Sequence, residues 1–187
     1  MDKVLVIAAA IFLTAAILLF NRLIGLRNRA ASAWSDIDVQ LKRRHDLVGS
    51  LVEVVKGYAK HERTTLEEIA EVRTKARAVL DGGSPGEAGK VESGLARRIG
   101  KLFALVEAYP ELKASDNFLN LHHTLVEVED KIQNARRYYN AVVRDLNTHI
   151  QSFPDMFLAS LFRFREREFF ELDSDAEAAV PRIDLES

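Results

Sequence analysis

A long heptad pattern constrains this chain more than any other feature of its sequence. From Trp34 onward, positions reached by alternate steps of three and four residues are nearly all apolar. This heptad stripe comprises Trp34, Ile37, Leu41, Arg44, Val48, Leu51, Val55, Tyr58, Glu62, Thr65, Ile69, Val72, Ala76 and Val79. Such spacing keeps one helix face toward a neighbouring helix turn after turn. We therefore expect one coiled-coil-like helix from about Arg29 to Leu80.

Two further helices and a short fourth are predicted after it. The run Asp81-Gly82-Gly83-Ser84-Pro85-Gly86 is a loop signal, and a shorter amphipathic helix follows at residues 87–108. Ser115-Asp116 offers an N-cap for a third helix that extends to about Gln151. A fourth element begins after Pro154. Its apolar side chains, which we expect to close one end of the bundle, are Met156, Phe157, Leu161 and Phe162.

The amino-terminal stretch from Val4 to Phe20 is apolar except for Thr14. A membrane-spanning helix needs roughly twenty largely apolar residues, and Arg22 can extend to the interface from its end. The alternative is a cleaved signal sequence. Its only candidate cleavage site, Ala31-Ser32-Ala33, lies beyond the basic residues and inside the helical pattern. We expect an uncleaved single-pass anchor.

Basic residues flank this span on its carboxyl side. Arg22, Arg27 and Arg29 follow it closely, whereas only Lys3 and the amino terminus precede it. Positive flanks tend to remain in the cytoplasm, so we expect an inner-membrane protein whose large domain is cytoplasmic. The same arginines are candidates for contact with anionic lipid, whereas the cluster Lys42-Arg43-Arg44 is better explained as a solvated face.

Composition excludes several classes of function. The 26 basic and 28 acidic residues nearly cancel, so the chain lacks the overall positive charge of a nucleic-acid-binding protein, and we expect no nucleic-acid partner. The absence of cysteine excludes disulfides, thiolate metal sites and thiol catalysis.

These observations predict an all-α fold in which a transmembrane helix continues into an antiparallel bundle of three long helices and a short fourth. We predict an anchor at residues 1–26, a helical-bundle domain at residues 27–172 and an acidic, flexible tail at residues 173–187.

Histidines beside carboxylates are the only candidates for a metal or acid–base site. His123 and Glu127 are one turn apart on the third helix, next to His122. Two ligands on one face do not make a metal site, so a solvated charged face is the simpler interpretation. The pairs His45-Asp46 and His61-Glu62 diverge by about 100° around a helix and lack a nearby nucleophile. We therefore expect no cofactor, no metal and no catalytic residues.

Arg44 and Glu62 occupy apolar slots of the heptad stripe. Buried polar groups at such slots can fix helix register or partner choice. The alternative, which we prefer from the sequence, is a long side chain that reaches water at the edge of the bundle.

An ordered set of motifs resembles the LemA family over nearly the whole chain. The first block is Trp34, Ile37, Gln40-Leu41, Arg43-Arg44 and Asp46-Leu47-Val48, followed by Leu51-Val52-Glu53, Val55-Lys56-Gly57-Tyr58-Ala59 and His61-Glu62. The later blocks are Glu107-Ala108-Tyr109-Pro110-Glu111-Leu112-Lys113-Ala114, Asn117-Phe118-Leu119, Glu129, Ile132, Ala135-Arg136, Tyr139-Asn140, Asn147, Phe153-Pro154 and Phe169-Phe170-Glu171.

The resemblance implies a bacterial membrane protein with one amino-terminal span and a helical bundle. It implies no enzyme activity and supplies no catalytic residues. Two stretches depart from the family pattern: Gly49-Ser50 stands where Pro-Asn is usual, and Phe162-Arg163-Phe164 replaces an end that contains glycine.

A membrane-anchored scaffold or adaptor is the function that we expect. The family signature contains many polar residues outside the heptad stripe, and the fold does not require them. The candidate residues for binding a protein partner or a second copy are Arg43, Asp46, Glu53, Lys56, His61 and Glu62. The alternatives are a homo-oligomeric membrane organiser that contacts anionic lipid, and a metal-dependent sensor or enzyme that uses His122, His123 and Glu127.

Overall fold

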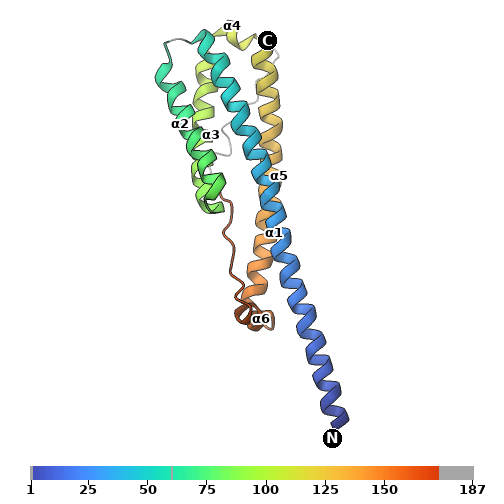
Figure 1. Ribbon diagram of the computed structural model, residues 1–187. Helices are drawn as coiled ribbons and strands as arrows, with labels where there is room; N and C mark the ends of the chain where they lie inside the picture. The colour runs from blue at the N-terminus through green and yellow to red at the C-terminus, as the bar shows by residue number, and fades with distance from the viewer. Residues whose placement is uncertain (1, 60, 173–187) are drawn as a thin grey trace. The chain divides into compact units, whose positions relative to one another are not determined.

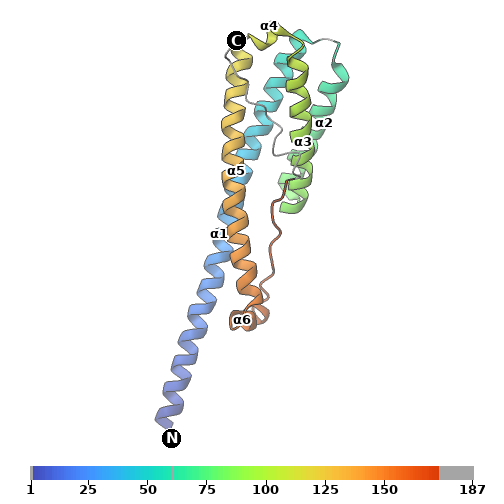
Figure 2. The ribbon, with the colours of Figure 1, turned by 180° about the vertical axis from the view of Figure 1, so that it is seen from behind.

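The computed structural model describes residues 2–59 and 61–172, and over this part of the chain it is helical with no strand. The helices are α1 (Asp2–Tyr58), α2 (Arg63–Gly82), α3 (Pro85–Val106), α4 (Pro110–Lys113), α5 (Asp116–Gln151) and α6 (Asp155–Leu161). Figures 1 and 2 show this order from opposite sides. The predicted all-α fold with a long amino-terminal apolar helix is confirmed. The predicted tail at residues 173–187 lies outside the described residues.

The chain forms two compact units. Unit 1 consists of residues 1–35 and 137–169, and unit 2 of residues 36–136 together with the chain from Phe170 onward. Both α1 and α5 contribute residues to each unit, because their bounds cross the division.

Unit 2 contains the apolar core, and the heptad stripe supplies much of it. Val48, Leu51 and Val55 of α1 are fully buried, as are Ile99 of α3 and Phe118 of α5. The stripe continues into α2, where its residues Ile69 and Ala76 are buried together with Leu66. Within this unit α2 and α3 lie side by side in both views (Figures 1 and 2).

The long helix predicted at residues 29–80 is wrong in one respect, because it is interrupted. α1 ends at Tyr58 and α2 begins at Arg63. The interruption contains Glu62, a polar slot of the heptad stripe, and the next slot, the polar Thr65, lies in the first turn of α2. The pattern persisted across the break because both helices turn an apolar face toward the same core. The break also leaves α2, at 20 residues, close in length to α3, at 22 residues.

Local signals set the other helix ends as expected. Ser84 and Glu87 form a reciprocal capping box at the start of α3: the Glu87 amide donates to Ser84 Oγ and the Ser84 amide donates to the Glu87 carboxylate, with Pro85 in the first turn. The boundaries of α5 agree with the predicted helix from Ser115-Asp116 to Gln151.

Gly89 of α3 leaves room for the backbone of Glu171, near the end of the described chain. A Cβ at this position would lie 2.1 Å from the carbonyl oxygen of Glu171. Only glycine permits this approach, and Phe170 next to it is fully buried. Within unit 2, Phe170 and Glu171 therefore pack closely on α3.

In unit 1 an extended segment at residues 164–169 follows α6 and is held by side chains of α5. Asn147 makes two hydrogen bonds to the backbone of Arg167. Its Nδ2 donates to the Arg167 carbonyl and its Oδ1 accepts from the Arg167 amide, both at 2.9 Å. The Tyr139 hydroxyl donates to the Glu168 carbonyl at 2.8 Å. Burial raises the pKa of the Tyr139 phenol, which keeps it protonated as a donor.

The amino-terminal part of α1 is long and apolar enough to cross a membrane, and none of that window is buried in the protein. Large apolar side chains such as Ile11, Phe12 and Leu18 are exposed along it. α1 continues without interruption through residues 31–33, the only candidate cleavage site.

Candidate functional site

The six candidate partner-binding residues lie on the surface of unit 2, on α1 or in the turn that follows it. The four on α1 are exposed, His61 is exposed and Glu62 is half-buried immediately before α2. They are Arg43, Asp46, Glu53, Lys56, His61 and Glu62. None of them belongs to the apolar core.

An open groove of about 590 Å³ runs between α1 and α2. Asp46 and Glu53 from the candidate set line it, together with Gly49, Ser50, Arg73 and Arg77. Arg77 Nη2 lies 3.0 Å from Asp46 Oδ1 and bridges the two helices. Both side chains are about half exposed or more, so this pair contributes little to stability and remains accessible to a partner. We call this the α1–α2 groove.

Gly49 shapes the floor of the α1–α2 groove. A Cβ there would lie 1.7 Å from Arg73 Nη1, so the absence of a side chain lets the guanidinium lie against α1. The Arg73 Nε is buried and makes no hydrogen bond. Gly49-Ser50 was one of the two departures from the family pattern. α1 remains helical through Gly49-Ser50. The structural effect of this departure is the space that Gly49 leaves for the Arg73 guanidinium.

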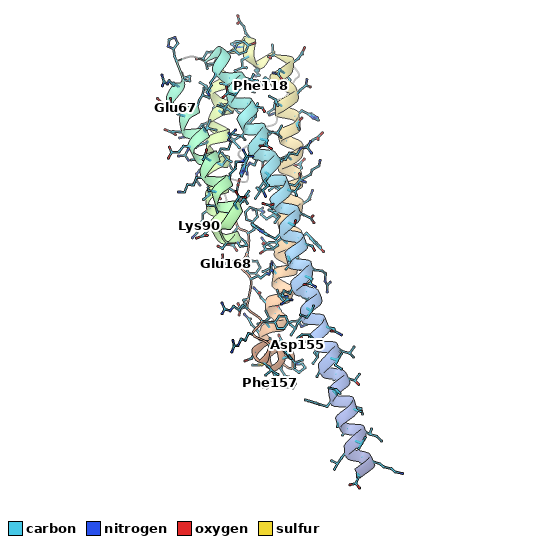
Figure 3. All side chains as sticks on the ribbon, viewed as in Figure 1. Glu67, Lys90, Phe118, Asp155, Phe157 and Glu168 are labelled. Atoms are coloured by element: carbon cyan, nitrogen blue, oxygen red, sulfur yellow. The ribbon has the colours of Figure 1, made fainter. Side chains whose placement is uncertain are left out.

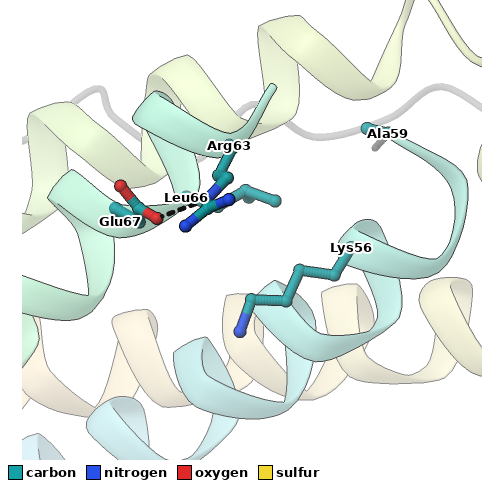
Figure 4. Close-up of a pocket in the computed structure, with 5 residues that line it drawn as sticks. All are labelled: Lys56, Ala59, Arg63, Leu66 and Glu67. Carbon is teal, nitrogen blue, oxygen red and sulfur yellow. Dashed lines mark hydrogen bonds and ion pairs between the residues drawn. The ribbon is translucent and has the colours of Figure 1, made fainter. Parts of the chain in front are cut away.

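A smaller hollow of about 380 Å³ lies where α1 turns into α2 (Figure 4). Lys56 of the candidate set lines it, opposite Arg63 and Glu67 of α2. Arg63 Nε donates to Glu67 Oε1 at 2.8 Å, the interaction drawn in Figure 4. Lys56 donates to Glu53 at 2.7 Å. Three of the six candidates thus line hollows between α1 and α2, whereas Arg43, His61 and Glu62 line neither.

Unit 2 also contains a buried charge network that the sequence did not reveal. Arg44 Nη1 lies 3.1 Å from Glu92 Oε2, and Arg44 Nε lies 2.9 Å from Glu129 Oε1 without hydrogen-bond geometry. His45 Nε2 lies 2.7 Å from Glu92 Oε1. Arg44, His45 and Glu92 are each at most 1% exposed. The expectation that Arg44 reaches water at the bundle edge is therefore wrong.

The network joins three helices, with Arg44 and His45 on α1, Glu92 on α3 and Glu129 on α5. Desolvation raises the pKa of the Glu129 carboxyl, Arg44 lowers it, and Glu92 and Asp130 raise it. Removing one partner of such a pair leaves an uncompensated buried charge, which is strongly unfavourable. We infer that the network fixes the register of α1, α3 and α5. From the sequence alone, this role of Arg44 was the alternative to a side chain that reaches water.

Glu92 had a signal in the sequence. It shares a helix face with Ile99 and Phe103, so it interrupts an apolar face as Arg44 does. Two opposite charges at apolar positions of different helices predict a buried pair. Arg73 and Arg77 are one turn apart on α2. The sequence does not show that they line a groove, because the groove forms only when α2 folds back on α1.

The three residues of the metal-site alternative have separate environments. His122 is buried, with its ring 4.8 Å from that of Phe103 and stacked near Phe118. His123 and Glu127 are exposed, with His123 Nδ1 3.5 Å from Glu127 Oε1, as a solvated face predicts. His122 departs from that expectation because it packs in the core. Across residues 2–59 and 61–172, no three histidine or carboxylate groups are placed to hold a metal ion.

Comparison with known proteins places the chain in a family. Its sequence matches the model of the LemA family over residues 33–185. This chain belongs to the LemA family. It is 28% identical to Protein LemA of Metamycoplasma hominis, an alignment that covers 82% of this chain and 73% of that protein.

Other relatives in this family are named for the magnetosome. The chain is 25% identical to Magnetosome protein MamQ 2 of Paramagnetospirillum magneticum, over 89% of this chain and 70% of that protein. Magnetosome protein MamQ of Magnetospirillum gryphiswaldense is 25% identical over 88% and 69%. The resemblance to the LemA family is confirmed, and the chain is a membrane-associated, bacterial LemA-type protein.

Proposed function

We propose that this LemA-family protein is a non-enzymatic adaptor, anchored in the inner membrane by residues 4–20, that offers the α1–α2 groove to a protein partner or to a second copy of itself. The observation that carries the proposal is the groove itself. It is open, charged and formed by side chains that the core does not need.

The chemistry of the groove favours a partner that carries both charges. Arg73 and Arg77 lie on its α2 side, and Asp46 and Glu53 on its α1 side. The Arg77 guanidinium is about half exposed, so it can donate charge-assisted hydrogen bonds to a carboxylate of a partner. Three relatives are named as magnetosome proteins, which supports a part in an assembly rather than in a reaction.

The direction of the anchor supports a cytoplasmic groove. Arg22, Arg27 and Arg29 are all exposed just after the apolar stretch. Positive residues at this end oppose translocation, so the rest of the chain remains on the cytoplasmic side.

A photo-crosslinking amino acid at Ser50 tests the proposal in the full-length protein in cells. Ser50 is exposed and lines the groove, and Asp130, exposed on α5 of the same unit, is the matched control position. We expect one dominant adduct from position 50 and none like it from position 130. The adduct is identified by mass spectrometry as a foreign protein or as a second copy.

The triple variant Asp46→Ala, Glu53→Ala, Lys56→Ala provides the second half of the test. We expect it to retain helicity, membrane association and unfolding midpoint but to lose most of the adduct at position 50. An adduct that persists at full yield in this variant, or that forms equally from position 130, contradicts a groove-specific partner.

A further inference from the structure

Unit 1 exposes a cluster of large apolar side chains in and around α6, outside the anchor. Their exposed fractions are 78% for Phe153, 43% for Met156, 65% for Phe157, 72% for Leu161 and 54% for Phe162. We call these five residues the apolar cap; Figure 3 labels Phe157 among them. The expectation that Met156, Phe157, Leu161 and Phe162 close one end of the bundle is wrong, because these four side chains are exposed. Five exposed apolar groups within ten residues indicate an interaction surface.

The orientation of α6 is fixed by its other face. Asp155 and Ala159 are buried, and Asp155 pairs with His149 of α5. At its carboxyl end, the Phe164 amide donates to the Ala159 carbonyl and the Arg163 amide donates to the Ser160 carbonyl, with Arg163 at φ 55°. This is a Schellman motif, the usual closure of a helix. The apolar cap therefore cannot turn inward without breaking these contacts.

The apolar cap is continuous with the anchor. The Phe162 ring lies 4.6 Å from the ring of Phe20, the last residue of the apolar stretch, and the Phe164 ring lies 6.1 Å from it. Both contacts are within unit 1. A side chain that touches Phe20 lies at the level where the anchor leaves the hydrocarbon layer.

Arginines gather beside the apolar cap. A cavity of about 240 Å³ is lined by Arg27, Arg163, Arg165 and Arg167, against one acidic residue, Glu166. The Arg27 guanidinium lies 5.7 Å from the centre of the Phe164 ring. Apolar side chains next to several arginines are typical of an interfacial membrane element. In such an element the apolar side chains enter the acyl boundary and the arginines contact headgroups.

We propose that residues 153–167 form a second membrane contact, in which the apolar cap inserts into the leaflet beside the anchor and the arginine-lined cavity receives an anionic phospholipid headgroup. A lipid is favoured over a second protein copy because the apolar cap touches the anchor at Phe20 and the adjoining cavity carries excess positive charge. The proposal rests on the membrane anchor of the proposed function. It is independent of the α1–α2 groove.

Fluorescence quenching in vesicles tests this proposal with the full-length protein. The chain has no cysteine, so single labels with an environment-sensitive fluorophore can be introduced by Phe157→Cys and Leu161→Cys. Ala141→Cys, exposed on α5 of the same unit, is the aqueous control, and Phe12→Cys is the control inside the anchor. Vesicles contain phosphatidylcholine with or without phosphatidylglycerol, and carry a spin-labelled lipid quencher at either a shallow or a deep acyl position.

We expect labels at positions 157 and 161 to lose most of their emission to the shallow quencher and to resist aqueous iodide. Position 12 should respond most to the deep quencher and position 141 only to iodide. Quenching at position 157 should be stronger with phosphatidylglycerol, and Arg163→Gln with Arg165→Gln should remove that difference.

Three results would overturn the proposal in distinguishable ways. If position 12 is not quenched by lipid, the anchor itself fails and the proposed function fails with it. If position 12 is quenched but position 157 responds to iodide alone, the apolar cap stays in water. If position 157 is shielded from both quenchers, a protein copy covers the apolar cap instead of lipid. Equal quenching in both lipid mixtures would refute the headgroup site.

Discussion

Unit 1 and unit 2 distribute polarity in opposite ways, although both are built partly from α1 and α5. Unit 2 buries a charge network and exposes further charges along its groove. Unit 1 holds its extended segment with the neutral side chains of Asn147 and Tyr139, and it exposes the apolar cap and the anchor. Different parts of α1 and α5 therefore have different surroundings in the two units. This difference agrees with the two proposals, a protein partner for the groove of unit 2 and a lipid contact for unit 1.

The largest expected effect tests the charged interior of unit 2. Arg44→Met leaves Glu92 and Glu129 without their cation, so we expect a loss of roughly 3–5 kcal/mol in the free energy of unfolding. Chemical unfolding in detergent micelles, followed by circular dichroism, measures it. Arg43→Met at the neighbouring exposed position is the control and should change stability little. Equal effects of the two substitutions would show that the network does not support the fold.

A smaller effect is expected from the neutral contacts of unit 1. Asn147→Ala removes both hydrogen bonds to Arg167, and we expect a loss of about 1–3 kcal/mol. Amide hydrogen exchange should accelerate at Arg167, whereas exposed Thr148→Ala should leave it unchanged. If the Arg167 amide exchanges at the original rate in Asn147→Ala, the extended segment is held by other means.

A pH dependence sharpens the contrast between the two interiors. The pKa of Glu129 is raised above 4.5, so the folded state binds this proton more tightly than the unfolded state. Stability from this group therefore falls as pH rises above about 4.5, until the folded-state pKa is passed. The stability of Glu129→Gln relative to the original protein should rise over that window. A pH-independent difference between Glu129→Gln and the original protein would contradict the assignment.

The smallest expected effect concerns the end of α6. A non-glycine residue in the left-handed region is strained by roughly 1–2 kcal/mol, whereas glycine adopts it freely but loses more chain entropy on folding. We expect Arg163→Gly to stabilise unit 1 by about 0.5–1 kcal/mol in the same unfolding assay. Arg165→Gly, in the extended segment, should not stabilise it. A stability loss in Arg163→Gly would mean that the arginine side chain outweighs the strain.

Most of the fold was accessible from local patterns. The bounds of α5, the loop before α3 and the apolar amino-terminal part of α1 follow from periodicity, capping and proline, which act within a few residues. The interruption between α1 and α2 was missed because a heptad pattern reports which face is apolar and not whether the helix is continuous.

The site was less accessible because it depends on contacts between distant segments. Arg44 finds Glu92 48 residues later in the chain, and the α1–α2 groove exists only once Arg73 packs on Gly49. The apolar cap shows a third limit. The apolar side chains of α6 predicted burial inside the protein. The structure instead exposes them on the surface of unit 1.

The network of Arg44, Glu92 and Glu129 also sets an order of events during synthesis. Arg44 leaves the ribosome well before Glu92, and Glu129 follows later still in α5. Until then the guanidinium has to stay hydrated, because burying it alone is strongly unfavourable. The α1–α2 hairpin therefore cannot complete its interior while it is being made. We therefore expect the interior of unit 2 to be complete only after α5, which carries Glu129, has been synthesised.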